Sequence, residues 1–180
     1  YGHTICWHAN QNASYLNGLI APIKGEPRWD VIMEQDFETD DESNYQYNGN
    51  AIKSYTADGE GAYGIGRALK ITNSEDRPND WDCQLYLKFS PKTVEGEIYE
   101  LSMDVRADAP ATFSDQAQTE PTQYKHWVFF GPVSATTEWQ TITRQVTISK
   151  DQATCGAIAF NLGLKGTNYY FDNITLKKYD

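Results

Sequence analysis

Aromatic side chains next to polar turns are the residues of this sequence best suited to binding a ligand. Trp81 follows the turn Pro78-Asn79-Asp80, and Tyr124 and Trp127 follow the polar stretch 114–123. Flat aromatic rings pack against the C–H faces of pyranose rings, while planar amide and guanidinium groups bond to sugar hydroxyls in fixed directions. We therefore predict a platform for a sugar chain. Its ligand-binding residues are predicted to be Trp81, Gln84, Tyr124, Trp127, Arg106 and Asn161.

Patterns that indicate catalysis are weak. His3, His8 and His126 have no H-E-x-x-H or triad context, and the sequence contains no G-x-S-x-G motif. The glycine-rich run 61–66 opens onto a predicted strand, so it lacks the helix N-terminus that holds a pyrophosphate. Carboxylates crowd between residues 36 and 42, where oxygen ligands for Ca²⁺ are a more plausible role than a catalytic pair. We predict a binding protein with no catalytic residue.

The composition excludes several classes of protein. The 180 residues carry 25 acidic and 15 basic side chains, which gives a formal charge of -10. This charge argues against a nucleic-acid partner, because such partners are bound through Lys and Arg. No apolar run approaches the roughly 18 residues that a membrane helix needs. Cys6, Cys83 and Cys155 have no C-x-x-C spacing, so we predict three buried small hydrophobic side chains.

Short runs of alternating apolar and polar residues predict an all-β fold. Alternation is clearest in four runs, residues 84–89, 98–105, 142–148 and 157–162, with turn residues between them. Many short strands at this spacing are typical of a β-sandwich, or jelly roll, built from two antiparallel sheets.

The side chains of a strand alternate between the core and the exterior, so each run predicts two faces. The predicted inward residues are Leu85, Leu87 and Phe89, then Tyr99, Leu101, Met103 and Val105, then Ile158, Phe160 and Leu162. If these three strands share one sheet, its exposed face combines Gln84, Arg106 and Asn161 with small residues and leaves room for a polar ligand. Trp139 and the run Tyr169-Tyr170-Phe171 are better explained as core residues.

From Val31 to its last residue the chain resembles carbohydrate-binding module family 4 and its relative family 22, which are β-jelly rolls. The resemblance is carried by four motifs in the correct order: Asp36-Phe37-Glu38, Trp81-Asp82-Cys83-Gln84, Thr136-Thr137-Glu138-Trp139-Gln140 and the closing run 170–176. It implies that Trp81 and Gln84 line a xylan-binding cleft, with Tyr124 as its second aromatic residue. The chain departs from the family pattern in having Gln84 where Glu is found.

The same resemblance implies a structural Ca²⁺ ion. In these modules the ion joins an early Glu to the Asp of a late D-N motif, which correspond to Glu38 and Asp172 here. Such a site would tie the first strand to the last.

The first eleven residues resemble a barrel strand of glycoside hydrolase family 10, the retaining endo-β-1,4-xylanases. The segment 2–11 is similar to that family's G-H-T-L-V-W-H-x-Q strand, with one additional residue before Gln11. The segment 29–34 is similar to its acid/base motif W-D-V-V-N-E. However, Met33 replaces the Asn and no second catalytic Glu strand follows, so we assign Glu34 no catalytic role.

These patterns predict two parts, a catalytic-domain fragment and linker in residues 1–27 and a carbohydrate-binding module in residues 28–180. We expect the module to be inserted in a xylanase and to bind β-1,4-xylan chains in an open cleft, which would target the parent enzyme to its substrate.

The alternatives to this function are an active glycosidase fragment that uses Glu34 and a structural spacer that binds no sugar. Expected partners are xylan or xylo-oligosaccharides and the parent catalytic domain, with no nucleic acid and no membrane insertion. We expect a monomer that is secreted, cell-surface or periplasmic. The sequence leaves open whether the ligand is xylan or mixed-linkage β-glucan.

Overall fold

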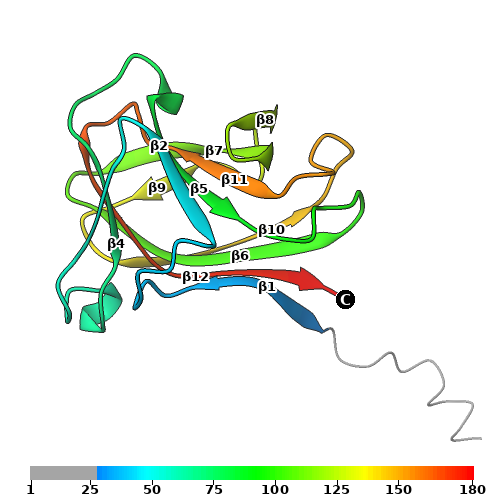
Figure 1. Ribbon diagram of the computed structural model, residues 1–180, viewed down its shortest axis with the longest axis horizontal. Coiled ribbons are helices and arrows are strands. Elements are labelled where there is room, and N and C mark those ends of the chain that lie inside the picture. The colour runs from blue at the N-terminus through cyan, green and yellow to red at the C-terminus, as the bar shows by residue number, and fades with distance from the viewer. Residues whose placement is uncertain (1–27) are drawn as a thin grey trace, which may run out of the picture. The chain divides into compact units, whose positions relative to one another are not determined.

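Two antiparallel β-sheets face each other across a core of aromatic and aliphatic side chains in the computed structural model, which describes residues 28–180 (Figure 1). The first sheet, called the β6 sheet, has the order β10 (Gln140–Thr147), β6 (Ile98–Ala107), β12 (Thr167–Tyr179), β4 (Leu69–Asn73) and β3 (Ile52–Tyr55), and β1 (Trp29–Gln35) pairs with β12. The second, called the β5 sheet, has the order β2 (Tyr45–Gly49), β5 (Cys83–Lys88), β11 (Ala157–Asn161), β7 (Ala111–Glu120) and β8 (Gln123–His126), and β9 (Val133–Ala135) pairs with β7. The predicted all-β sandwich of two antiparallel sheets is confirmed.

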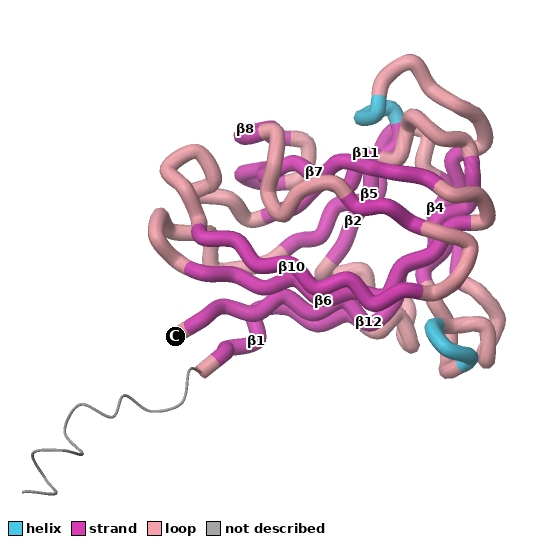
Figure 2. The backbone as a smooth tube through the Cα atoms, turned by 180° about the vertical axis from the view of Figure 1, so that it is seen from behind, coloured by secondary structure: helices cyan, strands magenta, loops and turns pink. Residues whose placement is uncertain are grey.

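Helical structure in residues 28–180 is limited to two short 3₁₀ turns, η1 (Ala62–Gly64) and η2 (Asp80–Asp82). Both turns lie at the end of the sandwich that carries β4, one beside each sheet (Figure 2). Neither turn is long enough or apolar enough to cross a membrane.

Interlocked aromatic rings from both sheets form the centre of the core. The ring of Phe113 on β7 lies 5.5 Å from that of Phe160, 5.8 Å from that of Tyr169 and 6.0 Å from that of Phe171, in edge-to-face arrangements. Phe160 and Phe171 stack across the sheets with 5.9 Å between centroids. Aromatic pairs in these arrangements stabilise a fold by more than the burial of their surface area alone would do. This cluster therefore fixes how the two sheets face each other.

The four predicted strand runs are confirmed, and so are the inward faces predicted for three of them, although Phe89 lies just after β5 and is only partly buried. Leu85 and Leu87 are fully buried, as are Met103, Val105 and Phe160. Cys83 and Cys155 are buried and free, as predicted, whereas Cys6 lies outside the described residues. The predicted part formed by residues 1–27 also lies outside them.

The condition that residues 84–89, 98–105 and 157–162 share one sheet is not met by the middle run. That run is β6, which belongs to the other sheet, so Arg106 does not share a face with Gln84 and Asn161. Alternation identifies the side of a strand that faces the core, but a core-facing side looks the same in either sheet. The sequence pattern therefore could not assign β6 to its sheet.

Two of the predicted core aromatic residues are placed differently. Tyr169 and Phe171 point into the core, but Tyr170 between them points outward from β12, where it is nearly covered. Trp139 is only partly buried and lies just before β10, with its ring 6.5 Å from that of Tyr170. The prediction of core packing is thus wrong for Trp139, because a bulky ring beside a strand end can bury one face and leave the other open.

We expect Phe113→Ala to lower the free energy of unfolding by about 3–5 kcal/mol, because it removes the ring that touches three others and leaves a cavity. Urea unfolding followed by far-UV circular dichroism measures the change. Leu164→Ala is the control, since Leu164 is 56% exposed and its truncation should change stability by about 0.5 kcal/mol or less. Equal losses in the two variants would contradict the assignment of Phe113 to the centre of the core.

Candidate functional site

A groove of about 330 Å³ lies on the outer face of the β5 sheet. Strands β2, β5 and β7 supply its floor, and β8, η2 and the residues after β8 supply its walls. The central strand β11 contributes Ala159 to this face, between Tyr86 of β5 and Gln116 of β7. A small side chain between two larger ones leaves the middle of the sheet hollow. The residues that line the groove are Asn48, Trp81, Gln84, Tyr86, Gln116, Gln118, Thr122, Tyr124 and Trp127.

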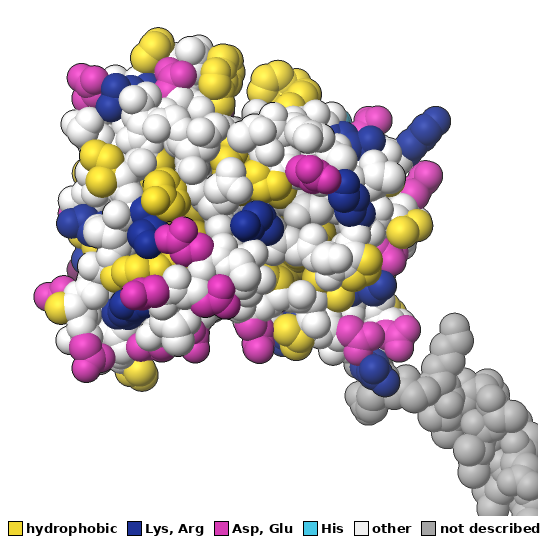
Figure 3. Space-filling view, in the orientation of Figure 1, with side chains coloured by type: hydrophobic (Ala, Val, Ile, Leu, Met, Phe, Trp, Pro, Cys, Tyr) yellow, Lys and Arg dark blue, Asp and Glu magenta, His cyan; other side chains and the backbone are white. Residues whose placement is uncertain are grey.

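Three exposed aromatic side chains stand around this groove. Trp81 is 50% exposed, Tyr124 is 49% exposed and Trp127 is 60% exposed. The rings of Tyr124 and Trp127 are 5.0 Å apart and inclined at 57°, so they form one continuous wall. In the space-filling view, hydrophobic side chains project along the edge that carries β2 and β8 in Figure 1 (Figure 3). Large rings this exposed are a surface on which an apolar ligand face can stack.

The floor of the groove is a chain of hydrogen-bonded neutral side chains. Asn48 Nδ2 donates to the Tyr86 hydroxyl at 3.2 Å, and that hydroxyl donates to Gln84 Oε1 at 2.5 Å. Gln84 Nε2 donates in turn to Asn161 Oδ1 at 2.8 Å. Each amide is therefore held in one orientation and keeps hydrogen-bonding capacity for a ligand. Burial raises the pKa of the Tyr86 phenol, so this hydroxyl is neutral at physiological pH.

Asn161 supports the floor from the side, as the cross-strand neighbour of Gln84. It is 2% exposed and does not line the groove, whereas Gln84 does. Asn161 Nδ2 donates to Ser114 Oγ at 3.3 Å, and Ser114 Oγ donates to Asp80 Oδ2 at 2.9 Å. The structure thus brings together Trp81, Gln84, Tyr124 and Trp127, with Asn161 holding Gln84.

No side chain that lines this groove carries a charge at neutral pH, although the chain has a formal charge of -10. Acidic side chains gather elsewhere, notably along the lower edge of the molecule (Figure 3). An uncharged floor with exposed rings suits a neutral, polyhydroxylated ligand, because nothing in it favours an ion.

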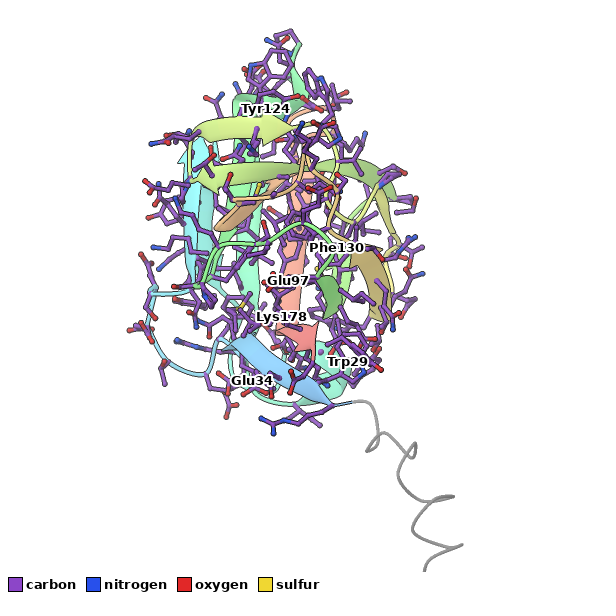
Figure 4. The ribbon with its side chains drawn as sticks, turned by 90° about the vertical axis from the view of Figure 1, so that its right-hand side faces the viewer. Trp29, Glu34, Glu97, Tyr124, Phe130 and Lys178 are labelled. Carbon is purple, nitrogen blue, oxygen red and sulfur yellow. The ribbon has the colours of Figure 1, made fainter. Side chains whose placement is uncertain are left out.

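The loop after β8, which carries Trp127, is anchored from the core. Asp115 is 1% exposed and accepts hydrogen bonds from the backbone N–H groups of Phe129 (3.2 Å), Phe130 (2.5 Å) and Gly131 (3.0 Å). Burial raises the pKa of the Asp115 carboxyl, and the three N–H groups oppose that rise. Phe130 lies on this loop between the sheets' edges, below the strand that carries Tyr124 (Figure 4). The wall of the groove therefore depends on a buried carboxylate that does not itself line the groove.

Arg106 belongs to a different surface. It lies on the outer face of the β6 sheet, with its guanidinium carbon 3.9 Å from the centroid of the Tyr170 ring. The prediction that it bonds a ligand together with Gln84 is therefore not supported by the arrangement of the sheets.

Glu34, which would be the catalytic residue if the chain were an active glycosidase fragment, is also far from the aromatic groove. It is exposed on β1, where it lines a separate groove of about 370 Å³ with Asp36 and Asp41. Figure 4 shows Glu34 and Tyr124 at opposite sides of the sandwich.

Glu38 and Asp172 line one pocket of about 380 Å³, together with Gly66. Asp172 is 2% exposed, and its two carboxylate oxygens accept the N–H groups of Ala62 and Asn173, each at 2.8 Å. Burial raises the pKa of Asp172 to about 6, and the neighbouring carboxylates Asp104 and Glu38 add to the rise.

The carboxylates of Glu38 and Asp172 give this pocket oxygen donors of the kind that a hard cation prefers. Gly66 has a φ of +57°, a conformation that glycine adopts without strain, and its backbone approaches the carboxylate of Glu38 so closely that a Cβ atom there would lie 1.9 Å from Glu38 Oε1. A divalent cation offsets the repulsion between carboxylates that face one another. Within residues 28–180 no three His, Cys, Asp or Glu side chains are arranged to hold a metal. A Ca²⁺ ion bound here would therefore need backbone or water oxygens as further ligands.

Sequence reasoning missed most of the floor. Tyr86 lies between the predicted inward residues Leu85 and Leu87 but has no predicted role. Gln116 and Gln118 belong to the stretch 114–123, which the sequence identifies only as polar, whereas the structure places them in β7. The signal was the alternation in residues 113–118, where Phe113, Asp115 and Ala117 face the core and the glutamines face outward. A strand with amides on its exposed side and an Asp among its inward residues has low β-propensity, which concealed it.

A β-sandwich with an uncharged, aromatic-walled groove on one sheet is the architecture of a sugar-binding module. A family model described as Carbohydrate binding domain matches residues 30–169, and the chain belongs to that family. No curated protein sequence matches the chain.

Solved structures share the fold. The CBM22-1 xylan-binding domain of Paenibacillus barcinonensis Xyn10C is similar at 16% identity and a TM-score of 0.62, with 86% of this chain and 97% of that one covered. A CBM4 structure is similar at 21% identity and a TM-score of 0.58, with 83% and 94% covered. The Clostridium thermocellum Xyn10B CBM22-1–GH10 structure, complexed with xylohexaose, matches at 16% identity and a TM-score of 0.59, over 82% of this chain and 28% of that one.

We expect Asp115→Ala to loosen the wall of the groove, because three buried N–H groups lose their acceptor. The free energy of unfolding should fall by about 2–4 kcal/mol. Hydrogen–deuterium exchange should become faster at the amides of residues 129–131. Asp115→Asn, which keeps one acceptor oxygen, is the control and should show a smaller change at the same amides. Unaltered exchange there in Asp115→Ala would contradict the anchoring role.

Proposed function

We propose that the groove on the β5 sheet binds internal stretches of a β-1,4-xylan chain without catalysis and so holds a parent endo-xylanase on its substrate. The observation that carries the proposal is the arrangement of Trp81, Tyr124 and Trp127 around a floor of fixed, uncharged amide and hydroxyl groups. A xylose ring offers apolar C–H faces to such rings and equatorial hydroxyls to such amides. The groove is open, so an internal stretch of polymer can lie across it.

Comparison with solved structures supports the choice of xylan. Domains with the same fold are described as xylan-binding, and one lies in a chain with a GH10 domain and a bound xylohexaose. The partners that we propose are therefore xylan or xylo-oligosaccharides and a family 10 catalytic domain. An extracellular, cell-surface or periplasmic location and a monomeric state complete the proposal, since the polymer cannot enter a cell.

Removing the indole of Trp81 should weaken binding of xylohexaose by about tenfold or more, because aromatic side chains that become covered in a complex contribute a large share of its binding free energy. Isothermal titration calorimetry measures the change, and binding should be driven by enthalpy. Val94→Ala is the control, since Val94 is 59% exposed and does not line the groove. Titrations with a mixed-linkage β-glucan oligosaccharide in parallel separate the two candidate polymers. Unchanged affinity for both sugars in Trp81→Ala would exclude this groove as the platform.

We also propose that Glu38 and Asp172 hold a structural Ca²⁺ ion. Glu38 lies in the loop that follows β1 and Asp172 belongs to β12, so the ion would join the end of the first strand to the last strand. Its chemistry is the neutralisation of carboxylates that otherwise repel each other. The ion would have no part in contacting the sugar, because the aromatic groove lies on the other sheet.

Calcium should raise the melting temperature of the protein, and EDTA should reverse the rise. A hundredfold excess of free Ca²⁺ over its Kd stabilises by about 2.7 kcal/mol. Differential scanning calorimetry should show this response in the unaltered protein and its loss in Glu38→Gln. Glu34→Gln, a change in the neighbouring acidic groove, is the matched control and should keep the response. If Glu38→Gln responds to calcium as the unaltered protein does, this pocket is not the site.

A further inference from the structure

A second groove, of about 560 Å³, lies on the outer face of the β6 sheet. Its floor comes from β3, β4, β12 and β6, and its rim comes from Trp139 and the glycine-rich loop that begins at Thr56. It shares no residue with the aromatic groove of the β5 sheet. Its chemistry is also different, because it contains cations.

Two basic side chains flank one aromatic ring in this groove. Strand register places Arg106 of β6 and Lys70 of β4 on either side of Tyr170 of β12, with all three pointing outward. The Arg106 guanidinium lies 3.9 Å from the Tyr170 centroid and 5.7 Å from the Trp139 centroid. Lys70 Nζ lies 5.9 Å from the Tyr170 centroid. These contacts with two rings hold the guanidinium at the groove, which Arg106 and Lys70 both line.

Most of the donor capacity of these two cations is unused within residues 28–180. Arg106 makes one ion pair, from Nη1 to Asp108 Oδ1 at 3.3 Å. Asp108 is also engaged elsewhere, because it accepts Asn168 Nδ2 at 2.7 Å and the Tyr170 hydroxyl at 3.0 Å. Lys70 makes no hydrogen bond or ion pair with the described residues. A guanidinium has five N–H donors and an ammonium has three, so several remain for a ligand.

The acids around the groove leave this pair of cations available. Glu60 lines the groove, but its Oε2 accepts the backbone N–H of Ala57 at 3.1 Å in the loop at the rim. The groove therefore presents two cations against one carboxylate that is itself hydrogen-bonded. The whole chain has a formal charge of -10, so this excess of positive over negative side chains is a local property of the groove.

We propose that this groove binds a sugar unit that carries a carboxylate, that is, a uronic acid. Its carboxylate would lie between Arg106 and Lys70, where the planar guanidinium matches a carboxylate in a bidentate arrangement. The partly exposed face of Trp139 supplies a surface for the pyranose ring. The proposal adds a second site, of another ligand class, to the neutral groove and does not depend on that groove binding xylan.

The test is an NMR titration of the isotope-labelled protein with a glucuronic acid-substituted xylotetraose, with unsubstituted xylotetraose as the comparison. The substituted sugar should shift the indole N–H signal of Trp139 and the amides of Lys70 and Arg106. Unsubstituted xylotetraose should leave these signals in place. Affinity measured at the Trp139 signal should fall severalfold from 50 to 500 mM NaCl, because the contact is ionic.

Substitutions separate this groove from the first. Arg106→Gln and Lys70→Met should each weaken the Trp139 response by about tenfold. Lys150→Ala removes an exposed cation outside the groove and should leave the response unchanged. Melting temperatures of all variants verify that they fold, and Trp81→Ala, which disables only the first groove, should keep the response. The proposal is wrong if the substituted sugar shifts only signals of the first groove, if unsubstituted xylotetraose shifts Trp139 equally, or if the folded Arg106→Gln and Lys70→Met variants bind as before.

Discussion

The packing of aromatic rings between the two sheets is the constraint on which the other features of this protein depend. Phe113 and Phe160 come from one sheet and Tyr169 and Phe171 from the other, and their rings meet within about 6 Å. Once alternate residues of each strand are committed to this core, the residues between them must face outward. Because Phe113 points into the core, Gln116 and Gln118 of the same strand face the outer side of the β5 sheet. Because Tyr169 and Phe171 point into the core, Tyr170 between them faces the outer side of the β6 sheet. Both grooves are therefore consequences of how the core is built.

The floor of the neutral groove shows how polar side chains can be buried at low cost. Gln84 and Asn161 are 6% and 2% exposed, a placement that destabilises a protein unless each polar atom finds a partner. The hydrogen-bonded chain from Asn48 to Ser114 supplies those partners and fixes the amides in the same step. A ligand then meets groups that are already oriented, so it loses less free energy to their ordering. Stability of the fold and readiness of the site come from one set of bonds.

Sequence reasoning predicted the fold class, the inward faces and the exposed aromatic residues because these follow from alternation and turn chemistry. It could not assign β6 to a sheet, since an inward-facing Met103 or Val105 packs equally well from either side. It also could not recognise β7, because the buried Asp115 and the outward glutamines look like a loop when their partners are unknown. The acceptor role of Asp115 becomes visible only when the N–H groups of residues 129–131 are brought to it by the fold. What was missed thus depends on contacts between residues distant in sequence, as does the grouping of Arg106 with Trp139.

The two outer faces of the sandwich differ in how their aromatic rings are used. On the β5 sheet, no side chain from residues 28–180 places a cation over the ring of Trp81 or Trp127, and both rings are at least half exposed, so an apolar surface can pack against them. On the β6 sheet, the Tyr170 ring is covered by the Arg106 guanidinium, so the ring fixes a charge instead of contacting a ligand directly. An acidic chain repels an acidic polymer at long range, but that repulsion is screened within about 10 Å at moderate salt, whereas a desolvated ion pair is screened far less. A local pair of cations can therefore overcome an unfavourable net charge. The groove of the β5 sheet needs no cation, because we expect a neutral sugar to bind there through stacking and through hydrogen bonds to uncharged groups.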